Sequence, residues 1–287
     1  MPLYERHPVS MPVIRPVLVA ALEGWIDAGL GAATAMAGLL AEIPTETLAT
    51  FDTDEFLDQR ARRPTAVIVD GVMESLTWPE IQLRVGEDLE GHSIAFLVGP
   101  EPDIHWRVFV DAIMELAIDL DVRMLVGLGA FPAPTPHTRP VRLAATSTDG
   151  EIAHKIGFVQ GSIEVPAGVE AALEMAFRDA GITAVGLWAR VPHYASGMPY
   201  PAASAALVDG LVSVAGLSID SSELHSAGDS ARTHVEELIA ENPKHMEMVR
   251  QLEKTMDATE GNALDLGIVP SGDEIAAELQ RYLNNER

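Results

Sequence analysis

Short apolar runs and segments of helical periodicity alternate over roughly the first 220 residues, as they do in α/β domains with a mainly parallel sheet. Helices are predicted at 28–41, 104–120 and 168–180, and again from Ala202, which follows Pro201. Apolar runs of strand length, bounded by Gly, Pro or Asp, lie at residues 17–22, 47–51, 93–98, 122–126, 141–146 and 182–188.

Two further signals concern pairing and capping. Residues 66–69 and 81–85 are apolar runs with no helix between them, which favours an antiparallel pair. Asp27 and Asp103 each stand where an N-cap residue is expected, just before a predicted helix.

The helix predicted at residues 168–180 is amphipathic. Its apolar positions share one face at helical spacing: Val169, Ala172, Leu173, Ala176 and Phe177. We therefore expect Glu170, Glu174 and Arg178 to point outward.

From residue 221 onward the pattern is helical only. One helix is predicted from Asp229, a second from Pro243 and a third from the capping box at residues 271–274. Their apolar positions are Val235, Leu238 and Ile239, then Met246, Val249, Leu252 and Met256, then Ile275, Leu279 and Leu283. The chain is thus divided into an α/β domain (1–222) and a C-terminal helical extension (223–287), which either packs on its own domain or forms an oligomerisation arm.

Charge and composition exclude several classes of protein. The chain carries 19 Lys and Arg against 43 Asp and Glu, a net charge of −24. Such acidity argues against binding to nucleic acid or to an anionic membrane surface. The absence of cysteine excludes disulfides and thiolate chemistry. We find no signal peptide and no apolar run of membrane-spanning length, and so expect a soluble cytoplasmic protein.

Polar residues follow three predicted strands. They are Glu23, Trp25 and Asp27 after the first, His137 and Arg139 in a proline-rich loop at 131–140, and His193 and Tyr194 after the last. In a parallel sheet these loops could converge on one edge, where acid–base chemistry or anion binding would be possible. The favoured alternative is a purely structural role, in which Asp27 only caps its helix and Trp25 only covers the end of the sheet.

No catalytic, cofactor or metal signature accompanies these residues. The nine histidines lack metal-ligand spacing, and no nucleophile elbow or phosphate loop is present, so we expect no metal and no cofactor. Gly29 and Gly31 open a helix as in a dinucleotide fingerprint, but the loop before them is too long and Thr34 occupies the last position. Close packing of helix on sheet is favoured for these glycines.

A set of motifs in a specific order resembles the proteasome assembly chaperone family of the second-subunit type, in particular its actinobacterial members. The motifs are ALEGWIDAG (21–29), RARRP (60–64), EPD (101–103), TPHTRP (135–140), LWARVPHY (187–194) and YP (200–201). The C-terminal segment from PSGDE (270–274) also resembles an extension of actinobacterial members.

This resemblance implies a phosphorylase/hydrolase-like three-layer α/β sandwich. Eukaryotic members help to assemble the proteasome α-ring without ATP, and archaeal and bacterial relatives tend to form homo-oligomers. The family offers no catalytic residue to carry over. The chain ends Asn284-Asn-Glu-Arg287, without the hydrophobic-Tyr-x ending that such chaperones use on the proteasome.

Two hypotheses of different classes follow. The first is a non-enzymatic, homo-oligomeric interaction protein, with a trimer as the expected state and proteasome subunits as possible partners. The second is a protein that binds or processes a small metabolite, nucleoside-like or anionic, in the strand-end cleft.

Overall fold

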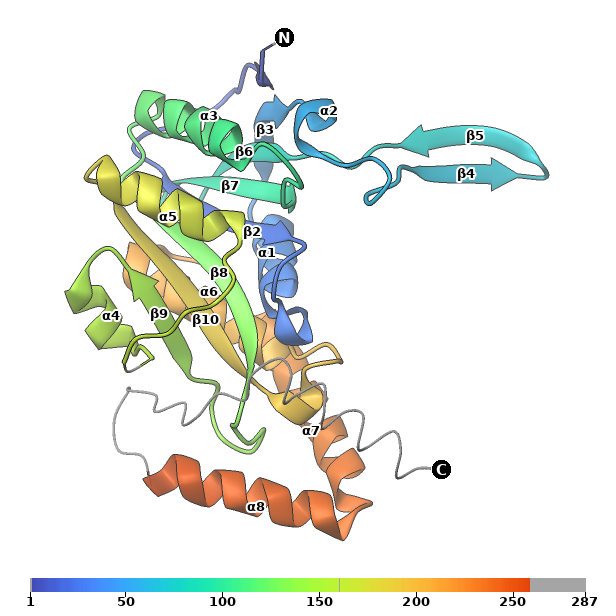
Figure 1. The fold of residues 1–287 in the computed structure, drawn as a ribbon, viewed down its shortest axis with the longest axis vertical. Coiled ribbons are helices and arrows are strands. Elements are labelled where there is room, and N and C mark those ends of the chain that lie inside the picture. The colour runs from blue at the N-terminus through green and yellow to red at the C-terminus, as the bar shows by residue number, and fades with distance from the viewer. Residues whose placement is uncertain (1, 160, 259–287) are drawn as a thin grey trace.

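The computed structural model describes residues 2–159 and 161–258, and an eight-stranded mixed sheet forms its centre (Figure 1). In spatial order the strands are β1 (Tyr4–Arg6), β3 (Thr45–Phe51), β6 (Gln82–Glu87), β7 (Ser93–Pro100), β2 (Val17–Glu23), β8 (Met124–Ala133), β10 (Thr183–Pro192) and β9 (Leu143–Ser147). The four strands β7, β2, β8 and β10 are parallel neighbours, and antiparallel strands flank them on both sides. Because β3 runs in the same direction as these four, most strands point one way.

Helices cover both faces of this sheet and make it the middle of three layers. On one face lie α1 (Gly31–Glu42) and α6 (Pro201–Ala215), which pack on each other. On the other face lie α3 (Trp106–Asp119) and α5 (Val169–Asp179). Successive residues of β2 alternate between the two cores, with Val17 and Val19 in the first and Leu18 and Ala20 in the second. The predicted α/β sandwich is therefore confirmed.

Shorter elements complete the body. They are η1 (Ala28–Leu30), α2 (Thr53–Phe56), α4 (Gly150–Ile156) and η2 (His193–Ala195). Within the described residues, no helix is both long enough and apolar enough to cross a membrane.

Two helices of the extension are described, and both belong to the same body. Helix α7 (Ser222–Ala240) packs along α6, with Leu224 against Gly38 and Val235 inside the core. Helix α8 (Pro243–Ala258) then turns back across the end of the sheet (Figure 1). The third predicted helix, from Ser271, lies outside the described residues, and the division at residues 222 and 223 stays a prediction.

The antiparallel pair proposed for residues 66–69 and 81–85 is wrong. Strand β4 (Thr65–Val69) pairs instead with β5 (Val72–Thr77), and this hairpin projects away from the main sheet (Figure 1). Asp70 and Gly71 form its turn with φ of 49° and 84°. Two positive φ values are what a type I′ hairpin turn requires, and Asp-Gly is a preferred sequence for it. Residues 82–87 pair with β3 and β7.

The cap assigned to Asp103 is also wrong. Helix α3 begins at Trp106 after His105, whose φ of 56° is left-handed. The carboxylate of Asp103 accepts hydrogen bonds from the backbone N–H of Asp58 at 2.9 Å and from Nε of Arg62 at 3.2 Å. It therefore fastens the loop after α2 and is not available to the helix.

Glu170 and Glu174 do not point outward as predicted. Both lie against the sheet, where Oε1 of Glu170 accepts the backbone N–H of Leu22 at 3.1 Å and Oε1 of Glu174 accepts the Thr146 hydroxyl at 3.0 Å. Gly127 and Gly186 make this approach possible, because a Cβ atom there would stand 3.0 Å and 2.4 Å from these carboxylates. Arg178 is exposed, as expected.

Candidate functional site

The loops that follow β2, β8 and β10 meet at one end of the sheet. Asp27 forms a bridge with Ala130 of β8. The backbone N–H of Gly29 donates to the carbonyl of Ser196 at 2.8 Å, and the N–H of Tyr200 donates to the carbonyl of Gly29 at 2.8 Å. Gly29 has a φ of 64°, and a Cβ atom there would lie 2.7 Å from that of Tyr200. The glycine therefore serves close loop packing.

His137 and Tyr194 form the most tightly organised pair at this end. The Tyr194 hydroxyl accepts the backbone N–H of His137 at 2.8 Å and lies 2.7 Å from its Nδ1. The hydroxyl thus bonds both the main chain and the imidazole ring of His137. His137 is 3 % exposed, and its Nε2 has no partner.

Burial fixes the protonation of both side chains. It lowers the pKa of His137, an effect that Glu236 and Glu253 oppose only in part, so the ring is neutral at pH 7. Burial also raises the pKa of Tyr194 to about 12. The exposed ring of His193 packs edge-on against Tyr194, with centroids 5.3 Å apart.

Arg139 already has anionic partners within the chain. Its Nη2 and Nε lie 2.7 Å and 2.9 Å from the two carboxylate oxygens of Asp257, and its Nη1 lies 3.3 Å from Glu253. Both acids belong to α8, and Thr138 also donates to Glu253. Asp257 raises the pKa of Arg139, and Arg139 lowers the pKa of Asp257. Helix α8 therefore lies over the loop where an external anion was expected.

Asp27 caps a helix, as the structural interpretation of this residue predicted. Its two carboxylate oxygens accept the backbone N–H groups of Ala32 and Ala33 at 2.8 Å and 2.9 Å, in the first turn of α1. Trp25 is 38 % exposed and lies beside Gly168, where a Cβ atom would be 3.0 Å from its ring. Glu23 is exposed at the end of β2. Among the described residues, no hydrogen bond joins these three side chains to the other candidates.

Sequence reasoning missed a second polar group, on the α5 face of the sheet. Burial raises the pKa of Glu170 to about 8, and burial also raises that of Glu174. Glu101, 8 % exposed, accepts the backbone N–H of Val169 at 2.6 Å. Among the described residues no group of acids or histidines is arranged to hold a metal. Glycines inside strands, such as Gly127 and Gly186, were the available signal.

Arg190 was missed as well. It stands in β10 between apolar neighbours and is 5 % exposed. Neither Nε nor Nη2 of its guanidinium has a hydrogen-bond partner. Burial, followed by repulsion from Arg142, lowers its pKa to about 10. An arginine within an otherwise apolar strand was the signal in the sequence.

Comparisons with known proteins decide the family. The profile of the PAC2 family matches residues 21–239. The chain belongs to the PAC2 family. The predicted resemblance to proteasome assembly chaperones is thus confirmed at the level of the family. Among proteins with curated functions, none matches the chain.

Solved structures of actinobacterial proteins are similar over most of their length. A Mycobacterium tuberculosis protein of unknown function, Rv2714, shares 33 % identity at a TM-score of 0.83, with 90 % of this chain and 92 % of that chain covered. A Corynebacterium glutamicum protein of unknown function shares 29 % identity at a TM-score of 0.84, and the match covers 89 % of this chain and 97 % of that chain. The M. tuberculosis proteasome-assembly chaperone homologue Rv2125 shares 33 % identity at a TM-score of 0.75, and the match covers 81 % of this chain and 99 % of that chain.

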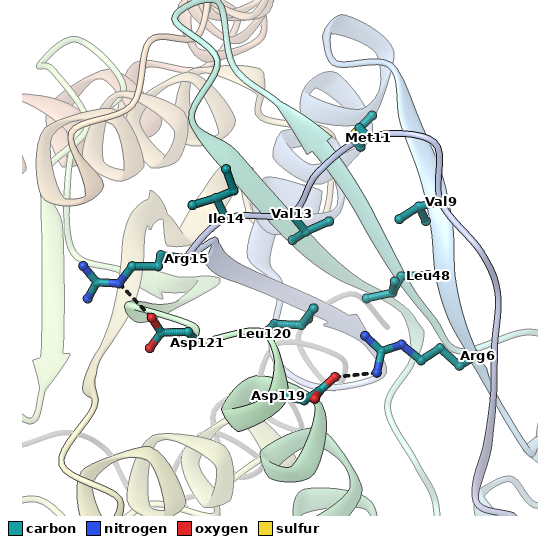
Figure 2. A pocket seen from close by; sticks show the side chains of 10 residues that line it. All are labelled: Arg6, Val9, Met11, Val13, Ile14, Arg15, Leu48, Asp119, Leu120 and Asp121. Carbon is teal, nitrogen blue, oxygen red and sulfur yellow. Dashed lines mark hydrogen bonds and ion pairs between the residues drawn. The ribbon is translucent and has the colours of Figure 1, made fainter.

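A pocket of this PAC2 protein lies away from all the candidate residues. It has a volume of about 490 Å³ and lies between the N-terminal segment and the end of α3 (Figure 2). Its wall is mostly apolar, and two ion pairs, Arg6 with Asp119 and Arg15 with Asp121, stand at its rim. A second pocket, of about 270 Å³, lies between α4 and α6. Neither pocket is lined by any of the strand-end candidates, which are Glu23, Trp25, Asp27, His137, Arg139, His193 and Tyr194.

Proposed function

We propose that this PAC2 protein is a non-enzymatic interaction protein that works in the cytoplasm as a homo-oligomer, a trimer, and that it binds proteasome subunits. The family relation to proteasome-assembly chaperone homologues supports the partner class. The hairpin β4–β5 is the single observation that carries the interaction role.

The hairpin exposes apolar side chains on both of its strands. Ile68, Val72 and Met73 are 61 %, 64 % and 61 % exposed, and Trp78 at its base is 48 % exposed. A two-stranded hairpin is marginal in water by itself, and clustered exposed apolar residues are typical of interaction sites. A second copy of the same chain is a partner present whenever the protein is made, so we assign the hairpin to the oligomer.

Substitution of the hairpin tests this assignment. We expect light scattering to give a trimeric mass for the wild type, and a monomeric mass for the double variant Ile68→Asp, Met73→Asp. The matched control is Ile118→Asp on α3, which is 65 % exposed and lies outside the hairpin. A monomeric wild type would contradict the oligomer, and a double variant that stays trimeric would contradict the assignment of the interface to the hairpin.

The proteasome partner is tested separately. Tagged protein isolated from its native host should enrich proteasome subunits, and the Ile68→Asp, Met73→Asp variant should not. If the trimer forms but no proteasome subunit is enriched, the partner is wrong while the oligomer stands.

The alternative, a small metabolite bound by the strand-end candidates, has weaker support. Arg139 binds Asp257 and Glu253 of its own chain, and Asp27 binds the first turn of α1. Tyr194 binds His137. Most of the polar groups expected to meet a ligand are therefore engaged.

A further inference from the structure

We propose that Arg190, with Arg142 beside it, binds the carboxylate of a small organic acid on the α5 face of the sheet, near the carboxyl ends of β8 and β10. This site is distinct from the hairpin and from the strand-end candidates.

The first argument is that Arg190 is buried without a partner. It is 5 % exposed, and both Nε and Nη2 lack any hydrogen-bond partner. A buried charge is costly unless it is paired and hydrogen-bonded, since it loses its hydration. The native fold therefore holds a cation whose stabilising anion the described part of the chain does not supply.

The second argument is the charge around Arg190. Arg142 of the adjacent chain segment is its cross-strand neighbour, and its carbonyl accepts the backbone N–H of Arg190 at 3.1 Å. Like charges directly opposite each other on one face of a sheet are destabilising. Among the described residues, Arg142 is the charged group that acts on Arg190, and the two like charges repel each other. A bound anion would relieve both the repulsion and the missing hydrogen bonds.

The third argument is where Arg190 lies. Ala189 and Val191 belong to the core beneath α1 and α6, so the alternation of a strand puts Arg190 on the opposite face. It occurs near the carboxyl end of β10, which runs parallel to β8, and α/β proteins bind their ligands outside the carboxyl ends of such strands.

The neighbours indicate which anion fits. Phe131 is the register partner of Arg190 on β8, and Trp188 precedes it by two residues on the same face. Both rings are half-buried. The free Nε and Nη2 form the edge of a guanidinium that pairs side-on with the two oxygens of a carboxylate. We therefore expect a carboxylate on an aromatic or apolar body, and use benzoate as the probe.

Binding is tested on the full chain at constant ionic strength, with chloride replaced by each probe, because salt alone affects so acidic a protein. Benzoate near 100 times its Kd should raise the wild-type Tm by on the order of 5 °C. Acetate should give a smaller shift. No shift with benzoate, or an equal shift with inorganic phosphate, would overturn the proposal.

The variant Arg190→Met keeps a long side chain and removes the charge. We expect its benzoate affinity to fall by about tenfold or more, since charge-assisted hydrogen bonds are lost. Without benzoate its Tm should equal or exceed that of the wild type. A lower Tm would mean that Arg190 is paired within the protein, and would overturn the proposal.

Two further variants complete the test. Arg142→Gln should weaken benzoate binding while leaving the fold intact, and so carries the test if Arg190→Met does not fold. Arg178→Gln is the matched control, because Arg178 is exposed on α5 and pairs with Asp179. Unchanged binding in Arg142→Gln, or a loss in Arg178→Gln equal to that in Arg190→Met, would contradict the site.

Discussion

At the scale of single residues, Glu170 couples stability to pH. Burial raises its pKa most, the N–H of Leu22 lowers it, and Glu174, Glu101 and Asp27 raise it, to about 8. A carboxyl group with a raised native pKa holds its proton more tightly in the folded protein than in the unfolded chain. As pH rises, the unfolded chain loses that proton first, so the free energy of unfolding falls between the unfolded and folded pKa values.

The variant Glu170→Gln should remove this pH dependence, because an amide cannot ionise and its carbonyl can still accept the Leu22 N–H. We expect it to be more stable than the wild type by about 1–3 kcal/mol near pH 8 and little different at about pH 3.5, below both pKa values. Urea unfolding at the two pH values measures this. Glu241→Gln, at an exposed position, is the control, and equal effects of pH on Glu170→Gln and the wild type would contradict the assignment.

Asp27 makes a second prediction at this scale. Its carboxylate satisfies two N–H groups at the start of α1, so Asp27→Ala should cost about 1 kcal/mol of stability, with part of it kept in Asp27→Asn. If Asp27 is a ligand contact and not a cap, Asp27→Ala will leave the unfolding midpoint in denaturant unchanged.

At the scale of elements, periodicity predicted the parallel core because each strand and helix carries its own pattern. The burial of Glu170 and Glu174 was not predicted, because it depends on Gly127 and Gly186, which belong to strands elsewhere in the chain. Arg139 was expected to meet an external anion, whereas its partner in the structure is Asp257, from a helix much later in the chain. Contacts between residues that are far apart in the chain produce no local sequence pattern from which they could be predicted. The hairpin turn at Asp70 and Gly71, by contrast, could have been predicted from the local sequence, since Asp-Gly is a preferred hairpin-turn pair.

Helix α8 is held over the strand-end loops mainly by polar contacts. Arg139 pairs with Asp257 and Glu253, and Thr135 contacts Met256 at 3.4 Å. In α8 itself Val249 is the buried residue of the helix. Pairs this exposed contribute about 0–1 kcal/mol and weaken with salt. The helix is therefore expected to open locally more easily than the sheet.

Hydrogen exchange checks this expectation. In Arg139→Gln, amides of α8 should exchange up to about fivefold faster than in the wild type, as the loss of about 1 kcal/mol implies. Amides of α1 should be unaffected. Arg178→Gln, which breaks an exposed pair on α5, is the control. Unchanged protection of α8 in Arg139→Gln would mean that the ion pairs do not hold the helix.

At the scale of the whole molecule, the hairpin β4–β5 is separate from the three-layer body. It adds no strand to the main sheet, and its residues are exposed throughout (Figure 1). Thr65 and Thr77 are paired at its base, so the two chain ends there are neighbours. Residues 65–77 can therefore be replaced by a two-glycine link without moving β3 or β6.

This deletion variant should fold and be monomeric, because the hairpin contributes to the interface and not to either core. The wild-type Tm should rise with protein concentration, since association stabilises the folded subunit by mass action, and the Tm of the deletion variant should not. Calorimetry over a hundredfold range of concentration measures both, with Ile118→Asp as the control that keeps the concentration dependence. A deletion variant that remains oligomeric would place the interface elsewhere on the body, and one that fails to fold would mean that the hairpin is part of the core.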